Sequence, residues 1–331
     1  MFHTANDTPE KLLQMLSALL LFAAVLGVIL FLASRVRGKR SDNWVGYLYL
    51  LPVVLLLAVG LVYPGLRTVY ESFFDASGGS YIGLDNYKTI FTDDDLLQVL
   101  FNTILWTVLV PLVATAIGLI YAILVDKSRF ESFAKALIFL PMAISMVAAG
   151  VIWKFMYEYR VDQPNVKQIG LINQLIVWLG GHPLQLLISD NLPGPLGMNT
   201  LLLIVVFIWI QAGFAMTILS AAIKAIPDEI IEAARLDGVT PWSMFVKITL
   251  PSVRTTIVVV LTTLAIGALK VFDVVRTMTG GNFKTSVIAN EFYSQLVRAS
   301  NQGLAAALAV VLFLLVTPII IYNIRQVRQE A

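Results

Sequence analysis

This sequence of 331 residues contains no cysteine and only two histidines, His3 and His182. Without cysteine, no disulfide bond can hold its loops together. The two histidines are far apart along the chain, so no metal site can be argued from them. An intramembrane enzyme would need a metal cluster or a nucleophile with its base, and the lack of cysteine, with both histidines outside the long apolar blocks, argues against it.

A nucleotide-binding loop is also missing. The Walker A pattern, GxxxxGK[ST], does not occur, and Gly38-Lys39-Arg40 lacks both the earlier glycine and the closing Ser or Thr. We therefore do not expect this chain to be an ATPase. If its function depends on ATP, separate subunits must hydrolyse it.

Charge is scarce and apolar residues are abundant. Charged residues make up 13% of the chain, against about 25% in a typical soluble domain, and hydrophobic residues make up 58%. A bilayer core of ~30 Å is crossed by about 20 apolar residues in a helix. Blocks of this length occupy 12–33, 45–64, 97–125, 136–157, 200–224, 253–275 and 303–324. We expect seven transmembrane helices, because lipid cannot satisfy exposed backbone groups and no strand-like alternation is present.

Orientation follows from the connections between these blocks. Lys and Arg are concentrated in the short segments 34–44, 126–135 and 224–254 and in the C-terminal tail. Cytoplasmic loops carry such an excess, so these segments are expected inside, with the N-terminus outside and the C-terminus inside. The first block lacks the basic start of a signal peptide, and we expect it to be retained as a helix.

The cytoplasmic segment EIIEAARLDGVTPWSMFVKITLP, residues 229–251, is unusually ordered for a loop. Pro227 suits the first turn of a helix, and residues 228–236 are good helix formers that Gly238 would end. Thr240 and Pro241 are typical of the cap and first position of a second short helix. A short amphipathic helix of this kind docks into a groove of another protein or packs on the end of its own bundle, and the residues alone leave both open.

The same segment resembles a known motif. Glu232-Ala233-Ala234, then Gly238, Ile248 and Leu250-Pro251, match every defined position of the EAA motif, EAA–x3–G–x9–I–x–LP, of ABC-type import permeases. The resemblance implies that this segment is the coupling helix that enters a cleft on a cytoplasmic ATPase subunit. The residues that would carry this coupling are Glu232, Ala233, Ala234, Gly238, Leu250 and Pro251.

Further stretches resemble sugar-importing permeases of the maltose type, and most closely alpha-glucoside permeases. They are VFDVVRTMTGGN (271–282), GLINQLIVWLGGHPLQLL (170–187) and VIANEFYSQLVRASNQGLAAALAVVLF (287–313). This implies an all-α integral membrane protein of the cell membrane, with a six-helix type-1 permease core and one extra N-terminal helix. The expected divisions are 1–44 for the extra helix and linker, 45–96 for the first core span and outer loop, and 97–325 for the permease domain, with its EAA loop at 225–252.

The resemblance also implies partners. They are a dimer of cytoplasmic ATPase subunits, a second homologous permease subunit and an extracytoplasmic sugar-binding protein, with no cofactor and no nucleic acid. The binding protein would dock on the outer loops 65–96 and 158–199, the second of which contains an amphipathic stretch at 169–179. Alpha-glucosides, maltose-like oligosaccharides, trehalose and glucosylglycerol all remain possible solutes.

Polar residues within spans are the candidates for solute contact. Gln211 is central in the fifth block, and Phe214 follows three residues later on the same helical face. Lys270 and Asp273 lie three residues apart near the outer end of the sixth block. The alternatives are an interhelical hydrogen bond for Gln211, packing for Phe214, and snorkelling or mutual pairing for Lys270 and Asp273.

Two other transport classes remain as alternatives. An ion-gradient-driven secondary transporter would usually place an acidic or basic residue near mid-membrane, and none of the seven blocks has a central Asp or Glu. The second alternative is an ABC permease for a solute other than a sugar. Such a permease would have the same spans and the same EAA motif.

Overall fold

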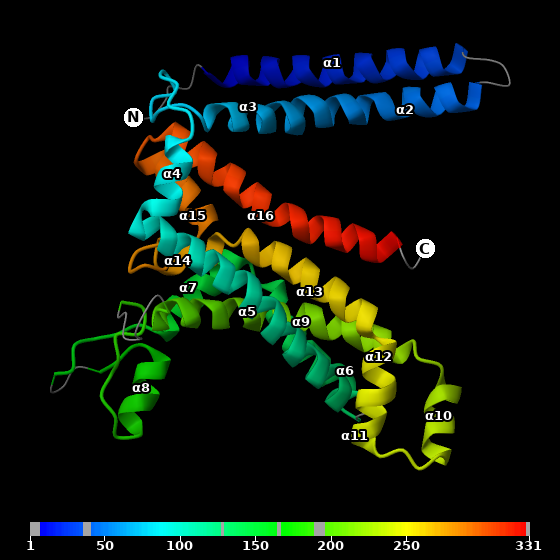
Figure 1. Cartoon of the computed structure of the whole chain (residues 1–331), viewed down its shortest axis with the longest axis vertical. Coiled ribbons are helices and arrows are strands. Elements are labelled where there is room, and N and C mark those ends of the chain that lie inside the picture. Colours follow the sequence, from blue (N-terminus) through cyan, green and yellow to red (C-terminus); the bar gives the residue numbers. More distant parts are fainter. Residues whose placement is uncertain (1–6, 36–40, 127–128, 164–166, 189–195, 329–331) are drawn as a thin grey trace. The chain divides into compact units, whose positions relative to one another are not determined.

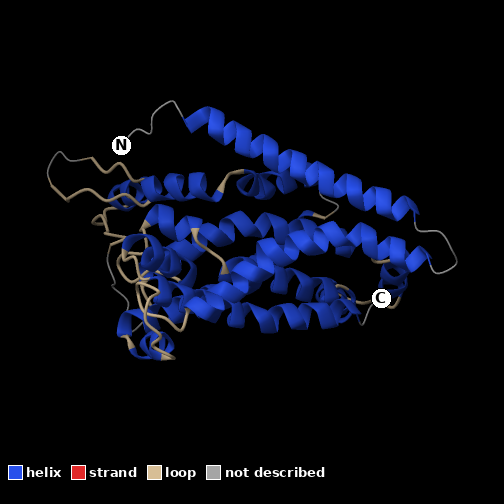
Figure 2. Cartoon of the chain, turned by 90° about the horizontal axis from the view of Figure 1, so that it is seen from above, coloured by secondary structure: helices blue, strands red, loops and turns tan. Residues whose placement is uncertain are grey.

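The computed structural model describes residues 7–35, 41–126, 129–163, 167–188 and 196–328. Every regular element in these residues is a helix, and the only β interaction among them is an isolated bridge between Phe74 and Tyr81. Figure 2 shows this helical architecture, with the loops in tan. The chain divides into two compact units, residues 1–70 and 71–331.

The first unit consists of long apolar helices. Helix α1 spans Asp7–Arg35, and α2 (Ser41–Leu57) continues through a π-helical segment (Ala58–Val62) into α3 (Tyr63–Glu71). The predicted block 45–64 is therefore helical to Glu71. Almost all described side chains here are exposed, including large apolar ones such as Leu13 and Leu61, as expected of helices that face lipid.

The second unit contains the remaining helices. They are α4 (Asp85–Thr92), α5 (Asp94–Val125), α6 (Glu131–Phe139), α7 (Met146–Met156), α8 (Leu171–Trp178), α9 (Met198–Lys224), α10 (Asp228–Leu236), α11 (Pro241–Met244), α12 (Leu250–Ser252), α13 (Arg254–Leu269), α14 (Asp273–Met278), α15 (Ile288–Tyr293) and α16 (Gln302–Arg328). Short 3-10 or π segments follow α6, α11 and α15, at Leu140–Ala143, Phe245–Thr249 and Ser294–Arg298.

The core of this unit is built around α9, which packs against both α5 and α13. Trp106 of α5 and Phe207 of α9 are fully buried, with their ring centroids 5.6 Å apart in an edge-on arrangement. Figure 1 shows α10 and α11 at one end of these long helices and α8 and α14 at the other. Within this unit, the helices of the predicted cytoplasmic loop 224–254 are thus at the opposite end of the bundle from α8, which belongs to the predicted outer loop 158–199.

Glycines allow the helices to approach closely. A Cβ added at Gly118 of α5 would lie 2.6 Å from the backbone nitrogen of Met216 in α9, and one at Gly213 of α9 would lie 2.5 Å from the carbonyl oxygen of Ile138. Small residues have this role in membrane helix interfaces, where van der Waals packing takes over from the hydrophobic effect.

One predicted span is broken, and another begins at a sharp bend. The block 136–157 bends by 99° between Glu131–Ala143 and Met146–Met156, and the segments Pro241–Ser252 and Arg254–Leu269 meet at 67°. The prediction of a continuous helix at 136–157 was wrong. Pro141 cannot donate to the helix, and Ser145 caps a new one by accepting from Ala148 N at 3.2 Å.

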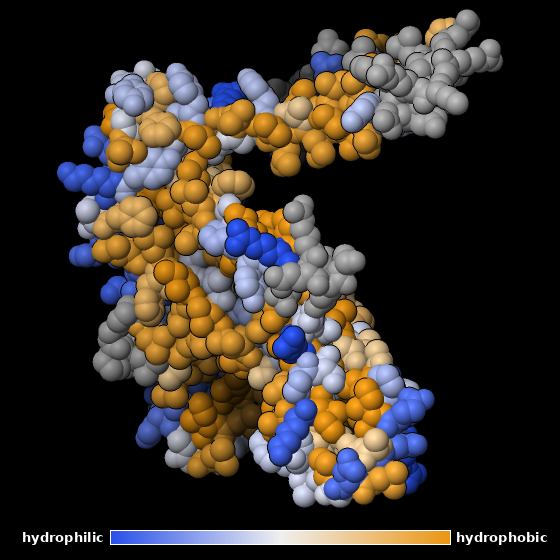
Figure 3. Space-filling view, turned by 45° about the vertical axis from the view of Figure 1, so that its right-hand side comes forward, coloured by the Kyte–Doolittle hydropathy of each residue, from blue (hydrophilic) through white to orange (hydrophobic). Residues whose placement is uncertain are grey.

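Four helices in the described residues are long and apolar enough to cross a membrane, or up to six if each bent pair is one span. The four are Tyr49–Glu71, Asp94–Val125, Met198–Lys224 and Gln302–Arg325. Part of α1, Lys11–Val25, is a shorter apolar helix. Figure 3 shows how much of one face of the molecule is covered by apolar side chains. The chain is therefore a multi-pass membrane protein by length and composition, and the full count of seven spans stays a prediction.

Candidate functional site

Helix α10 carries the motif residues Glu232, Ala233 and Ala234 and ends as the sequence predicts. Gly238 has a left-handed φ of 74°, its N–H donates to Arg235 O at 3.1 Å, and the N–H of Val239 donates to Ala234 O at 3.1 Å. This pair of bonds is a Schellman motif, which a glycine favours because it has no Cβ. Pro227 occupies the cap position rather than the first helical position.

The next short helix also begins as predicted. Thr240 caps α11 by accepting from Ser243 N at 3.3 Å, and Pro241 is its first residue. Leu250 and Pro251 start α12, just before the bend into α13. The motif segment therefore contains the glycine end of α10, the Thr240 cap of α11 and the bend before α13. Each of these features fixes the direction of the chain.

The two sides of α10 differ in exposure. Ala234 is buried, whereas Glu232 and Ala233 are exposed. Leu236 is 89% exposed, and Trp242 at the start of α11 is 73% exposed. Two large apolar side chains with so much exposure at a polar end of the bundle are typical of an interaction surface. We call Glu232, Ala233, Leu236 and Trp242 the α10 surface.

Beneath α10 lies a cavity of about 520 Å³. Asp228, Ile231 and Arg235 line it from α10, and Asp126 and Lys224 line it from the ends of α5 and α9. Because this space separates much of α10 from the bundle, α10 is held chiefly through its connections to α9 and α11.

Charged residues join the long helices at the same end. Lys224 of α9 pairs with Glu131 of α6 at 2.5 Å and lies 3.9 Å from Asp126. Lys135 pairs with the same Glu131 at 2.6 Å and donates to Ser220 Oγ of α9 at 2.5 Å. This cluster fixes α6 against the last turns of α9, directly before the chain enters α10.

Gln211 lies in the middle of α9 and is half-buried. Its side-chain amide forms no hydrogen bond with another described residue, so the alternative of an interhelical bond finds no partner there. A Cβ added at Gly267 of α13 would lie 3.7 Å from Gln211 Nε2. The Gln211 amide thus faces Gly267 of α13, which has no side chain. Its N–H donors and its carbonyl oxygen form no hydrogen bonds with the described residues.

The other three span candidates have different surroundings. Phe214 is half-buried and packs against the core, as its packing alternative expects. Lys270 is exposed and ends α13, whereas Asp273 is half-buried and begins α14. The expectation that Lys270 and Asp273 lie on one helix was wrong, and no ion pair joins them among the described residues.

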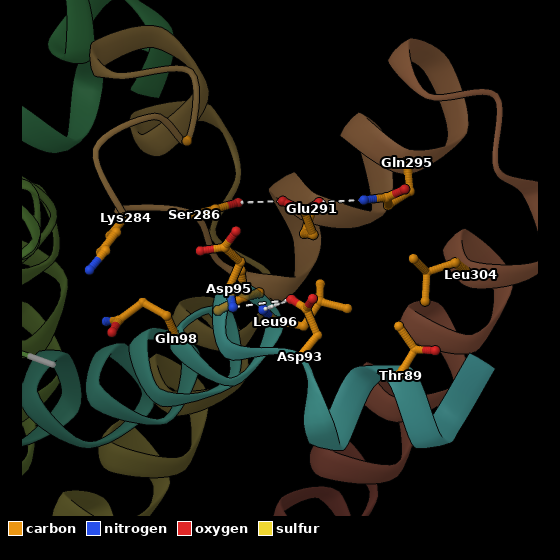
Figure 4. Close-up of a pocket in the computed structure, with 12 residues that line it drawn as sticks. Thr89, Asp93, Asp95, Leu96, Gln98, Lys284, Ser286, Glu291, Gln295 and Leu304 are labelled. Atoms are coloured by element: carbon orange, nitrogen blue, oxygen red, sulfur yellow. Dashed lines mark hydrogen bonds between the residues drawn. The ribbon is translucent and has the colours of Figure 1, made fainter. Parts of the chain in front are cut away.

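At the opposite end of the bundle, a cavity of about 440 Å³ lies between α4, the start of α5 and α15 (Figure 4). Two of its three carboxylates have local partners. Asp93 caps α5 by accepting from Leu96 N at 3.0 Å, and Glu291 accepts from Ser286 Oγ at 3.1 Å and from Gln295 Nε2 at 2.8 Å. The acidic run at 93–95 is therefore a helix start, where the helix dipole favours negative charge.

Buried amides hold the loop that follows α14. Asn102 of α5 donates to the carbonyl oxygens of Lys284 and Ser286 at 2.7 and 2.9 Å, and Asn199 of α9 donates to Phe283 O at 2.8 Å. Phe283 and Lys284 both have left-handed backbones, with φ of 56° and 58°. Our sequence reasoning missed Asn102 and Asn199. The available signal was an asparagine near the outer end of each of two apolar blocks.

The comparisons with known proteins agree with this architecture. The model of one family, described as binding-protein-dependent transport system inner membrane component, matches residues 114–327. The chain belongs to this family. The match contains both the α10 surface and the polar span residues, so the family's inner membrane role applies to the segment that carries the candidate site.

Two curated relatives are similar over most of the chain. The osmoprotective compounds uptake permease protein GgtC of Synechocystis is 46% identical over 86% of this chain and 99% of its own length. The alpha-glucoside transport system permease protein AglF of Rhizobium meliloti is 44% identical over 89% of this chain and 86% of its own. The relation thus extends beyond the EAA motif to nearly the whole permease.

A solved structure shows the same fold. A chain of a bacterial ABC transporter that imports the acidic polysaccharide alginate matches with a TM-score of 0.72 at 22% identity, over 87% of this chain and 96% of that chain. At this identity the likeness concerns the fold alone. It confirms the all-helical type-1 importer permease architecture that the resemblance implied.

Proposed function

We propose that this chain is a permease subunit of an ATP-driven importer that translocates a sugar of the alpha-glucoside or oligosaccharide class. One observation carries the proposal. The chain is 44% identical to an alpha-glucoside permease over 89% of its length, within a family of binding-protein-dependent inner membrane components. An extracytoplasmic binding protein delivers the sugar, and a second homologous permease subunit lines the path together with this chain.

The α10 surface is the proposed contact with the ATPase dimer. Glu232 supplies a charged contact, Ala233 allows close approach, and Leu236 and Trp242 supply apolar area. Ala234 packs inward, and Gly238, Leu250 and Pro251 fix the turns on either side. When ATP closes the ATPase dimer, α10 moves with it, and the turns transmit that motion to α9 and α13.

The proposed solute path runs between α9 and α13. Gln211 presents an amide with unused hydrogen-bonding groups beside Gly267, and sugar hydroxyls both donate and accept. Phe214 offers an aromatic face, and Lys270 and Asp273 flank the break after α13. In this arrangement the chain crosses the cell membrane seven times, with the N-terminus outside and the C-terminus inside.

A second candidate function is supported by the other relative. The 46% identical permease is named for osmoprotective compounds, so import of an osmoprotective solute is the alternative within the same family. The lack of a central Asp or Glu in the spans continues to argue against an ion-coupled secondary transporter.

The test begins with a pull-down from native membranes, using this chain as bait and mass spectrometry to identify the proteins that co-purify. We expect an ATPase with a Walker A sequence and a second EAA-bearing permease. Uptake of maltose, trehalose and glucosylglycerol is then measured in liposomes that contain this assembly and its binding protein. A chain that purifies alone and catalyses ion-dependent uptake would overturn the proposal.

A further inference from the structure

A second outer cavity, of about 460 Å³, has no role in the function proposed above. It lies between the end of α7, the segment after α8 and the loop after α14. Lys154, Tyr157, Glu158, Tyr159, Arg276 and Phe283 are among its lining residues. Its volume falls within the range of about 300–1,000 Å³ that is usual for small-molecule sites.

The charged groups of this cavity have no side-chain partners in the part of the chain that the structure describes. Among the described residues, the side chains of Lys154, Glu158 and Arg276 form neither hydrogen bonds nor ion pairs. The Arg276 guanidinium lies over the ring of Tyr293, with its carbon 4.5 Å from the ring centroid, and its Nη1 atom is buried without an acceptor. A shielded donor of this kind is costly unless some group accepts its hydrogen bond.

The cavity also has aromatic walls. Phe283 is 47% exposed, and its left-handed backbone is held in place by the hydrogen bond from Asn199 to its carbonyl oxygen, at 2.8 Å. Strained backbone of this type persists where the surrounding structure enforces it, and it is common at binding sites. Tyr159 lines the same cavity, and its hydroxyl makes no hydrogen bond among the described residues.

These features fit a hydroxylated ligand. Two cations and one carboxylate line the cavity, so hydroxyl groups that can both donate and accept match it better than a simple anion, for which Glu158 would be unfavourable. The exposed ring of Phe283 and the half-buried ring of Tyr159 lie beside these polar groups and offer flat apolar surfaces for the faces of a sugar ring.

The cavity is separate from Gln211. Asn199, which binds Phe283 at the edge of the cavity, lies twelve residues before Gln211 in the same helix. At 1.5 Å per residue, the two positions are ~18 Å apart along α9. One or two sugar rings in the cavity therefore would not reach Gln211.

We propose that this cavity is a binding site for one glycosyl unit of the solute, which the sugar occupies before it reaches the path between α9 and α13. The inference rests on the proposed sugar import. Arg276 and Lys154 donate to sugar hydroxyls, Glu158 accepts from them, and Tyr159 and Phe283 contact the ring.

The test uses the assembled transporter in lipid nanodiscs, without the binding protein. Binding of maltose and trehalose is measured by calorimetry for the unmodified chain and for a double variant, Glu158→Gln with Tyr159→Phe. We expect the variant to raise Kd at least ~10-fold, since it removes one charged acceptor and one hydroxyl. Tyr81→Phe is the matched control, because Tyr81 is an exposed tyrosine in another loop, and its Kd should not change.

Uptake in liposomes distinguishes the two proposals. The double variant should raise KM and retain Vmax, and the control Tyr81→Phe should change neither. Normal sugar uptake with Kd and KM unaffected by the double variant would overturn this site alone. Absence of sugar uptake by the unmodified assembly would overturn the proposed function, and the site with it.

Discussion

The backbone N–H of Val239 donates to the carbonyl oxygen of Ala234 at 3.1 Å, across the left-handed turn at Gly238. This bond closes the end of α10 and directs the chain from the α10 surface into α11. A Cβ added at Gly238 would have no described atom within 4 Å. Glycine is therefore needed at this position because of its left-handed backbone conformation, and not because a side chain would clash.

Replacing Gly238 with valine should uncouple the permease from its ATPase. An L-residue in the left-handed region costs about 1–2 kcal/mol, and a β-branched side chain is especially unfavourable there. The turn should open and misplace α10. We expect strongly reduced ATP-dependent uptake and weaker ATPase association in a pull-down, with normal membrane insertion. Gly238→Asn should retain more uptake than the valine variant, because asparagine tolerates this conformation.

Gly180→Val is the matched control for this variant. Gly180 has φ of 84° and also has no described atom within 4 Å of an added Cβ, but it follows α8 at the other end of the bundle. We expect it to leave ATPase association intact. Equal loss of association in both variants would mean that backbone strain alone explains the effect, and the coupling role of Gly238 would be rejected.

Replacing Gln211 with leucine should alter sugar affinity rather than stability. The Gln211 amide has no hydrogen-bond partner among the described residues, so its loss leaves no protein group unsatisfied. Leucine is close to glutamine in size. We expect KM for the transported sugar to change by several-fold, with the thermal unfolding midpoint of the purified assembly unchanged. A lower midpoint with unaltered KM would assign Gln211 a structural role instead.

Local signals explain why the EAA segment was predictable. Gly238, Thr240 and Pro241 each act on backbone within a few residues, and the structure confirms the helix end, the cap and the second helix start. The acidic run at 93–95 carries a local signal of the same kind, because Asp93 caps α5 through its immediate neighbours, but the sequence analysis predicted no helix start there.

The broken spans were harder to predict, because uniform apolarity conceals where a helix ends. Pro141 and Ser145 carried the signal for the bend before α7, but the length of the apolar block suggested one helix. The end of α13 at Leu269 has no comparable mark in the sequence. The hydrogen bonds from Asn102 join residues more than 180 positions apart, and only the tertiary fold places such groups together.

Replacing Asn102 with leucine should destabilise the outer end of the bundle. Its buried amide donates to the partly buried carbonyl oxygen of Lys284 and to the buried one of Ser286, and leucine would remove both hydrogen bonds. An unsatisfied buried group costs ~1–3 kcal/mol and a partly buried one costs less, so we expect a loss of about 2–4 kcal/mol, visible as a lower thermal midpoint. Thr92→Val is the control, because among the described residues the Thr92 hydroxyl makes one hydrogen bond, an exposed one to Lys88 O. A midpoint equal to the control's would contradict this role for Asn102.

Replacing Gly118 with alanine should weaken the packing of α5 on α9. The added Cβ would lie 2.6 Å from Met216 N and 2.7 Å from Ala215 Cβ, and backbone cannot yield as a flexible side chain does. Forcing extra volume into such a contact costs about 1–3 kcal/mol, although alanine favours an isolated helix over glycine. Gly27→Ala tests the opposite case, since no described atom lies within 4 Å of a Cβ added there in α1. We expect the thermal midpoint to fall for Gly118→Ala and to stay level or rise for Gly27→Ala. A rise for both variants would mean that α5 and α9 can separate at no cost, which is incompatible with α9 as the centre of the core.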